Sequence, residues 1–256
     1  MTTRNSSLCV VLVAPRNPLN IGAAARAMSN FGFDDMRLVN AYDVAFREAV
    51  SAVNAGPVLD AARQYPTVAD AVADCSLVVG TTSIGNRALE HPLRRLELGG
   101  RQIARKMTTA RVALLFGSEK FGLSNEDMSH CHWLIRIPTR EAHESMNLGQ
   151  AVALCLYEII RDPSVAKKNE AQAKAGARAA VGISGESAKS PAGAEDIERL
   201  TALLLETLAE SGYLKDGTGE SADLKVRRLL RRMNLNVQDA RMWLGMLRQI
   251  QWKVRH

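Results

Sequence analysis

Five short apolar runs alternate with segments of helical character between residues 8 and 161. The runs cover residues 8–14, 36–39, 76–79, 112–116 and 133–137. Runs this short and this continuous in hydrophobicity are typical of strands that are buried on both faces. Because strands that alternate with helices build parallel sheets, the pattern predicts an α/β fold with a parallel, doubly wound sheet.

The helical spacing of apolar residues and the N-capping patterns locate the helices between these strands. Helices are expected over residues 22–28, 47–54, 58–64, 101–107 and 148–160. Thr67 and Ser124, each followed by an aspartate three residues on, are expected to cap two more helices. Residues 86–98 have no regular period, and no element is predicted there.

The composition changes after Pro163, which ends the last helix of this pattern. Residues 164–193 are mostly alanine, lysine, glycine and serine, and such a segment buries too little apolar area to offset its ordering entropy. Three amphipathic helices are expected beyond it, the second capped by Ser221 and the third by Asn236. The sequence therefore predicts an α/β domain (1–163), a flexible linker (164–193) and a small all-α C-terminal domain (194–256).

Positive charge is concentrated at the end of the chain. Residues 221–256 contain nine Lys and Arg against two Asp, whereas the first 220 residues contain 24 basic and 25 acidic side chains. Five of the nine lie on one expected helix: Lys225, Arg227, Arg228, Arg231 and Arg232. Because five cations are too many for one helical stripe, some are expected to contact phosphate groups of a polyanionic partner.

Several other classes of protein and site are disfavoured. The four cysteines are Cys9, Cys75, Cys131 and Cys155, and their wide spacing indicates neither disulfides nor a zinc site. The triplet at residues 130–132 (His-Cys-His) fits no common ligand spacing, which favours a structural or surface role. No apolar run reaches the roughly 20 residues of a membrane helix, and residues 1–7 do not resemble a signal peptide. A cytoplasmic protein that needs no metal is expected.

Three loops of small and polar residues follow expected strands. They cover residues 80–85, 117–122 and 145–147, and polar Asn20 and Arg26 follow the first strand. Each alone has an ordinary interpretation as a turn, a helix cap or a solvated residue. Because ligands in open α/β sheets bind beyond the carboxyl ends of the strands, their recurrence predicts a shared ligand site.

Familiar nucleotide-binding motifs do not fit these loops. No G-x-G-x-x-G follows the first strand, which disfavours NAD binding and an ordinary Rossmann methyltransferase. Residues 117–122 have the glycine spacing of the start of a P-loop, but Leu123-Ser124 stands where Lys-Ser/Thr is required. ATP binding is therefore disfavoured, and no Ser-His-Asp arrangement is evident.

Three motifs lie after the first, fourth and fifth expected strands. They read NIGAAAR (20–26), FGSE with GLS (116–119 and 122–124), and IP with SMN (137–138 and 145–147). In order and spacing they resemble the three motifs of the SPOUT superfamily of RNA ribose methyltransferases, TrmH-like branch. Any one motif is weak evidence, whereas three in register are strong.

The resemblance implies a fold and an activity that hydrophobic patterning does not. It implies a parallel sheet with a C-terminal trefoil knot, although knots are rare exceptions to the usual connection rules. It also implies a homodimer that binds S-adenosylmethionine in the knot and methylates a ribose 2′-hydroxyl. The basic extension is similar to that of family members that modify the tRNA anticodon loop, at nucleotide 32, so tRNA is the expected substrate.

The motif positions imply roles for individual residues. Cofactor contacts, largely through backbone groups, are implied for Thr81, Thr82, Ser83, Gly117, Ile137, Ser145 and Met146. Arg26 matches the catalytic arginine of the family, and the residues expected to shape the catalytic site around it are Asn20, Glu119, Ser145 and Asn147. The residues expected to bind RNA are Arg26, Lys225, Arg227, Arg228, Arg231 and Arg232.

Two positions depart from the family pattern. Lys120 replaces a frequent glycine, and it either faces RNA or is an ordinary solvated lysine. Met146 replaces the usual leucine, which is a volume-conserving change.

The chemistry of Arg26 and the class of function each leave alternatives. A guanidinium with a pKa above about 12 is a poor general base, so Arg26 is expected to bind the adjacent phosphate and the developing oxyanion, with proton acceptance as the rival role. The alternatives to a tRNA 2′-O-methyltransferase are a ribosomal RNA 2′-O-methyltransferase and a non-catalytic RNA-binding dimer.

Overall fold

A computed structural model describes residues 7–41, 56–83, 90–140, 145–161, 190–214 and 219–255. The described strands form one seven-stranded sheet in which every pairing is parallel. In sheet order they are β3 (Arg63–Tyr65), β2 (Asp35–Val39), β1 (Leu8–Val13), β6 (Val112–Phe116), β4 (Leu77–Thr81), β7 (Trp133–Arg136) and β5 (Leu93–Arg95). The predicted α/β fold with a parallel sheet is therefore confirmed.

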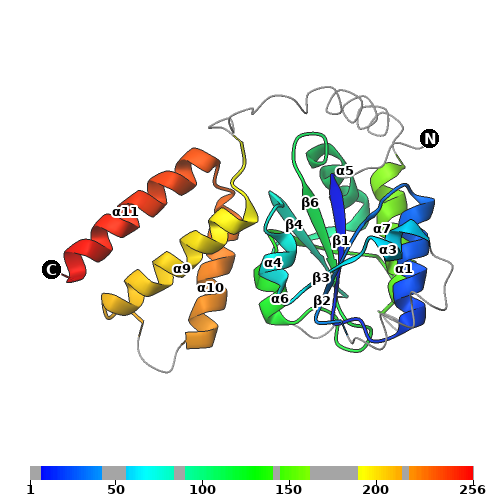
Figure 1. Ribbon diagram of the computed structural model, residues 1–256, viewed down its shortest axis with the longest axis horizontal. Coiled ribbons are helices and arrows are strands. Elements are labelled where there is room, and N and C mark those ends of the chain that lie inside the picture. Colours follow the sequence, from blue (N-terminus) through cyan, green and yellow to red (C-terminus); the bar gives the residue numbers. More distant parts are fainter. Residues whose placement is uncertain are drawn as a thin grey trace.

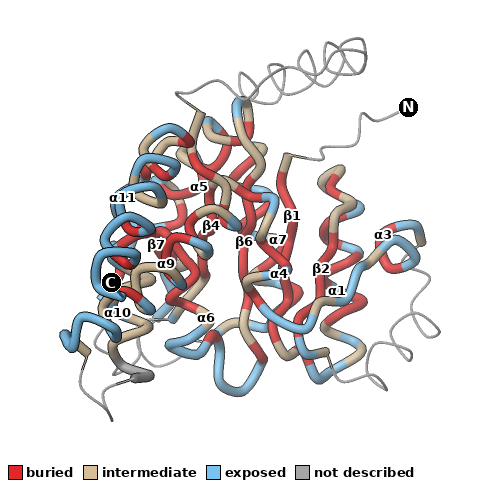
Figure 2. The backbone as a smooth tube through the Cα atoms, turned by 60° about the vertical axis from the view of Figure 1, so that its left-hand side comes forward, coloured by how far each residue is buried: buried red, intermediate tan, exposed pale blue. Residues whose placement is uncertain are grey.

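Helices cover both faces of this sheet (Figure 1). The first face packs against α1 (Pro18–Asn30), α3 (Pro57–Asp60), α5 (Leu96–Lys106) and α7 (Leu148–Ile160), and the second against α4 (Val68–Val72) and α6 (Asn125–Ser129). Along β1, Leu8, Val10 and Leu12 join the first core, whereas the alternate residues join the second. Figure 2 shows the central strands buried between the helical layers, as the continuous apolar runs predict.

Helices α1 and α7 pack unusually closely. A Cβ added at Gly149 of α7 would lie 2.5 Å from the Cβ of Ala23 on α1, which is too near for two real carbon atoms. The small residues at this crossing therefore let the two backbones approach. Because α1 follows β1 and α7 follows β7, the N-terminal ends of both helices lie near the carboxyl ends of the strands, and close packing brings these two ends together.

Some sequence predictions need correction. The helix expected at 58–64 ends at Asp60, and β3 begins within that range, at Arg63. Strand β5 lies within residues 86–98, where no element was predicted. Both are three-residue edge strands with mostly exposed side chains, so neither carries a hydrophobic period, and only pairing with β2 and β7 defines them. The helix expected at 47–54 lies outside the described residues.

Two of the helix caps predicted in the α/β domain are confirmed. Thr67 and Ser124 cap α4 and α6, the latter in a full capping box with Asp127. Helix α1 begins at Pro18, earlier than the predicted start at residue 22, with Asn17 as its cap.

Three C-terminal helices form a separate small core and pack on the second face of the α/β domain (Figure 1). They are α9 (Ala194–Glu210), α10 (Gly219–Met233) and α11 (Val237–Arg255). Helix α10 begins two residues before the predicted Ser221 cap, whereas the Asn236 cap is confirmed by a 2.8 Å bond from the Asp239 N–H.

The end of the predicted linker is in contact with these helices. Ala192 is buried, and its N–H donates to the Leu235 carbonyl. The Ala194 N–H donates to the carbonyl of Cys75 in the α/β domain. Residues 162–189 lie outside the described residues.

An ion-pair network lies at the amino end of the central strands, away from the predicted loops. Arg37 is only 1% exposed and donates two hydrogen bonds to each of Asp35 and Asp74. Asp35 also accepts from Arg63 and Arg111. Burial alone would raise the pKa of Asp35, but hydrogen bonds and charge from these arginines lower it to about 2. The ionised carboxylate therefore stabilises the folded state.

Asp35→Asn is expected to lower the free energy of unfolding by about 2 kcal/mol at pH 7. Because the pKa is depressed in the folded state, this stabilisation is present above about pH 4 and is lost as the pH falls toward 2. Urea unfolding of both proteins at pH 7 and near pH 2 measures the difference, with exposed Asp60→Asn as the control. A difference that does not shrink at low pH would contradict this account.

Candidate functional site

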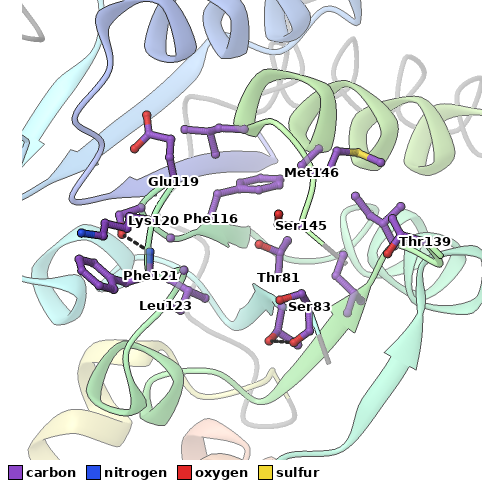
Figure 3. Close-up of a pocket in the computed structure, with 18 residues that line it drawn as sticks. Thr81, Ser83, Phe116, Glu119, Lys120, Phe121, Leu123, Thr139, Ser145 and Met146 are labelled. Carbon is purple, nitrogen blue, oxygen red and sulfur yellow. Dashed lines mark hydrogen bonds between the residues drawn. The ribbon is translucent and has the colours of Figure 1, made fainter. Parts of the chain in front are cut away.

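A cavity of about 300 Å³ opens at the carboxyl ends of β4, β6 and β7. Its volume lies at the lower end of the range for small-molecule sites. All seven residues with an implied cofactor contact line it: Thr81, Thr82, Ser83, Gly117, Ile137, Ser145 and Met146. Figure 3 shows the labelled residues of the three loops around this one space. The three loops therefore build a single site, as their positions after parallel strands predict.

Both polar and apolar residues line the cavity. The Thr81 hydroxyl donates to the Leu115 carbonyl at 2.9 Å, and the Thr82 N–H donates to the Ile135 carbonyl at the same distance. Apolar Phe116 and Leu123 also line the cavity. Both belong to the second motif, and Phe116 also ends an expected buried strand, but the sequence analysis gives neither of them a cofactor contact.

The loop after β6 turns back on itself tightly enough to require glycine at Gly117. The Gly122 N–H donates to the Ser118 carbonyl at 2.8 Å, and the Phe121 N–H donates to the Ser118 hydroxyl at 3.3 Å. A Cβ at Gly117 would lie 1.9 Å from the carbonyl carbon of Gly122. Only glycine therefore fits at the first position of this loop, where it also lines the cavity.

A chain of hydrogen bonds joins three loops beside the cavity. The Asn147 amide donates to the Asn20 side-chain oxygen at 2.8 Å, and the Asn20 amide donates to Glu119 at 2.9 Å. Asn147 also caps α7 by accepting from the Gln150 N–H. The structure thus brings together Asn20, Glu119 and Asn147, which the motifs single out separately.

Glu119 is held ionised at the end of this chain. Partial burial would raise the pKa of its carboxyl, but hydrogen bonds from Asn20 and from the backbone N–H groups of Arg16 and Asn17 outweigh burial and lower it. A carboxylate in this state can only accept hydrogen bonds, which fixes Asn20 with its amide toward Glu119 and its oxygen toward Asn147.

The remaining residues expected at the catalytic site, Ser145 and Arg26, are both exposed. Ser145 lines the cavity, where it is exposed. Arg26 lies on α1, six residues after Asn20, and its side chain is exposed. It forms no hydrogen bond or ion pair with the described residues, so its guanidinium can bind an added anion. Lys120 also lines the cavity, and its ammonium lies 5.1 Å from the centroid of the Phe121 ring.

The five basic residues of α10 do not share one environment. Lys225 and Arg232 are exposed. Arg227 pairs with Glu198 at 2.8 Å, and Arg228 pairs with Glu90 at 2.6 Å. Arg231 is 1% exposed. The helix therefore presents fewer cations to solvent than its sequence alone indicates.

The histidines of the triplet have structural surroundings. His132 is buried, its Nδ1 accepts from the Val78 N–H at 3.1 Å, and burial lowers its pKa to about 3. His130 lies 3.5 Å from Glu198. Within the described part of the chain, no group of three or more His, Cys, Asp or Glu could hold a metal ion. Among the described helices, none is both long and apolar enough to span a bilayer.

Comparison with known proteins identifies similar chains. The model of the SpoU rRNA Methylase family matches residues 7–157. The chain is 33% identical over 243 residues to the tRNA (cytidine/uridine-2'-O-)-methyltransferase TrmJ of Yersinia pestis (strain Pestoides F). This match covers 94% of this chain and 90% of that protein. It is 37% identical over 155 residues to the tRNA (cytidine-2'-O-)-methyltransferase TrmJ of Methanocaldococcus jannaschii, covering 59% and 66% of the two chains.

A solved structure has the same arrangement over nearly the whole length. The crystal structure of TrmJ from Z. mobilis ZM4 superposes with a TM-score of 0.76 at 32% identity, and the match covers 95% of this chain and 98% of that one. Because the match extends past residue 161, the similarity includes the C-terminal helices as well as the α/β domain.

Proposed function

Because the chain belongs to the SpoU rRNA Methylase family, we propose that it transfers a methyl group from S-adenosylmethionine to a ribose 2′-hydroxyl of tRNA. The observation that carries this proposal is the cavity beside the Asn147–Asn20–Glu119 chain, which all seven implied cofactor residues line. The relatives named as tRNA methyltransferases favour tRNA over ribosomal RNA as substrate.

The residues present fit this cofactor. Gly117 lines the cavity with backbone atoms alone, and the hydroxyl groups of Thr82 and Ser145 lie beside apolar Ile137 and Met146 in the same lining. When bound, S-adenosylmethionine supplies an electrophilic methyl group on its sulfonium. The role of the loops is to hold that methyl in line with the ribose oxygen, so positioning supplies much of the rate acceleration.

The transfer breaks the bond from sulfur to methyl, forms a bond from the 2′-oxygen to methyl and releases the hydroxyl proton. In this proposal Arg26 binds the phosphate next to the ribose and stabilises the oxygen as it loses its proton. The Asn147–Asn20–Glu119 chain fixes the first turn of α1 against the loop after β6, and so positions Arg26. Water or a group of the RNA accepts the proton.

The proposal extends to assembly and location. The protein works in the cytoplasm as a homodimer with a trefoil knot, residues 1–163 carry out the transfer, and residues 194–256 grip RNA. Residues 141–144, in the loop that the knot would include, lie outside the described residues. Nucleotide 32 of the anticodon loop is the proposed target.

The test is transfer of labelled methyl from S-adenosylmethionine to bulk tRNA and to ribosomal RNA, followed by digestion to nucleosides. A 2′-O-methylated nucleoside from tRNA is expected, and mapping the modified position tests nucleotide 32. Label only in ribosomal RNA would overturn the substrate, and no label in either, without cofactor binding, would favour a non-catalytic RNA-binding dimer.

Exposed Lys225 provides a test of RNA binding by α10. Lys225→Gln is expected to weaken tRNA binding and to reduce the slope of log K against log salt concentration by about 1, because one phosphate contact is lost. Filter binding at several salt concentrations measures both. The control is Arg105→Gln on α5, which is exposed but does not belong to the C-terminal helices, and equal slopes for the two variants would contradict this role.

A further inference from the structure

A second cavity, of about 460 Å³, lies between the α/β domain and the C-terminal helices. Four basic side chains line it, two from each side: Arg94, Lys106, Arg231 and Arg232. No acidic residue belongs to its lining among the described residues. None of its lining residues belongs to the cavity at the carboxyl ends of β4, β6 and β7. The positive charge of this cavity therefore favours an anionic ligand, separate from the ligand of the first cavity.

Arg231 is the most deeply buried of the four cations. Its side chain has 0% exposure, and only Nη2 has contacts, at 3.4 Å from both the Ala194 carbonyl and Glu198. Its Nε and Nη1 have no hydrogen-bond partner among the described residues. Glu198 also accepts from Arg227 at 2.8 Å, so one carboxylate serves two guanidinium groups. A buried cation left this incompletely paired is costly, and an added anion would relieve that cost.

The other basic residues carry further unused donors. Lys106 is half-buried, its ammonium has no ion pair among the described residues, and burial lowers its pKa. The Arg94 guanidinium stacks over the Trp133 ring at 4.3 Å and donates to Gln102, which fixes its plane. Arg232 is exposed. His132 adds a neutral donor, because its Nδ1 accepts from Val78 and its proton therefore lies on Nε2.

We propose that this cavity binds a phosphate group between the two domains. Guanidinium groups donate paired hydrogen bonds to phosphate oxygens, and an ammonium adds a compact charge, whereas four cations would repel a metal ion. The phosphate belongs either to an RNA backbone or to a free phosphate compound, because the same donors recognise both. In either case it joins α5 to α10 and fixes the C-terminal helices on the α/β domain. The inference does not depend on methyl transfer.

The test compares the full-length protein with Lys106→Met and Arg232→Gln, with Arg105→Met as the control. Arg105 precedes Lys106 on α5 but does not line the cavity. Thermal unfolding is measured in inorganic phosphate and in chloride at equal ionic strength, and tRNA binding is measured by filter binding. Both substitutions replace residues that are not fully buried, so folding is expected to persist in chloride.

If the site takes free phosphate, phosphate raises the Tm of the wild type and of Arg105→Met by about 2 °C or more, and both test variants lose the shift. If it takes an RNA phosphate, both test variants bind tRNA about 10-fold more weakly than Arg105→Met. Two results together would overturn the proposal. The first is that phosphate stabilises all four proteins equally or stabilises none of them, and the second is that the test variants bind tRNA with the same affinity as the control. Loss of methyl transfer alone would instead bear on the proposed function, since neither readout requires turnover.

Discussion

Arg26→Lys is expected to lower kcat for methyl transfer to tRNA by about 100-fold, and Arg26→Ala by about 1000-fold or more. The side chain is exposed on α1 and has no partner among the described residues, so its donors remain available to the RNA. Lysine retains the charge but loses the planar fork that can bind two phosphate oxygens at once. Single-turnover transfer of labelled methyl measures the chemical step, apart from product release.

The affinity for S-adenosylmethionine should be unchanged in these variants, because Arg26 does not line the cofactor cavity. Arg101→Lys, a similar change on the exposed part of α5, serves as the control. Near-normal turnover of Arg26→Lys would show that the fork geometry at this position does not matter. Activity of Arg26→Lys that recovers as the pH rises would instead support proton acceptance by the side chain at residue 26.

Gly117→Ala is expected to abolish measurable binding of S-adenosylmethionine, with a loss of affinity of at least about 1000-fold. The added Cβ would lie 1.9 Å from the carbonyl carbon of Gly122 and 2.1 Å from the Leu123 nitrogen. Both are backbone atoms, so no side-chain rotation can relieve the overlap, and the whole loop after β6 must move. Because this loop forms much of the cavity wall, the site is lost with it.

Gly212→Ala, which lies outside the cavity, provides a matched control for backbone strain. Gly212 has a φ of +73°, and a Cβ there would meet nothing within 4 Å. The control should therefore cost only about 1–2 kcal/mol of backbone strain and keep cofactor binding. Calorimetry with S-adenosylmethionine measures the affinities, and circular dichroism shows whether Gly117→Ala remains folded. Tight binding by a folded Gly117→Ala would contradict the proposed role of this loop.

The sequence by itself predicts the central strands and most helix caps. Residues 112–116 are read correctly as a strand because a continuous apolar run can be satisfied only by burial on both faces. Ser124 with Asp127 is read correctly as a capping box because both hydrogen bonds lie within four residues of chain. The loops that line the cavity are also predicted, since parallel strands place their carboxyl ends together.

Only the tertiary structure decides which residues touch across long separations. Asn20 and Asn147 are separated by 127 positions, and they meet because small residues let α1 and α7 pack closely. Strands β3 and β5 exist because neighbouring strands offer hydrogen bonds, while their own residues carry no period. The sequence gives no reason to distinguish the five basic residues of α10 from one another. In the folded protein, however, Arg231 is buried and Lys225 is exposed. Local patterns determine elements because their hydrogen bonds and burial are local, but the environment of a charge depends on the surface that folds against it.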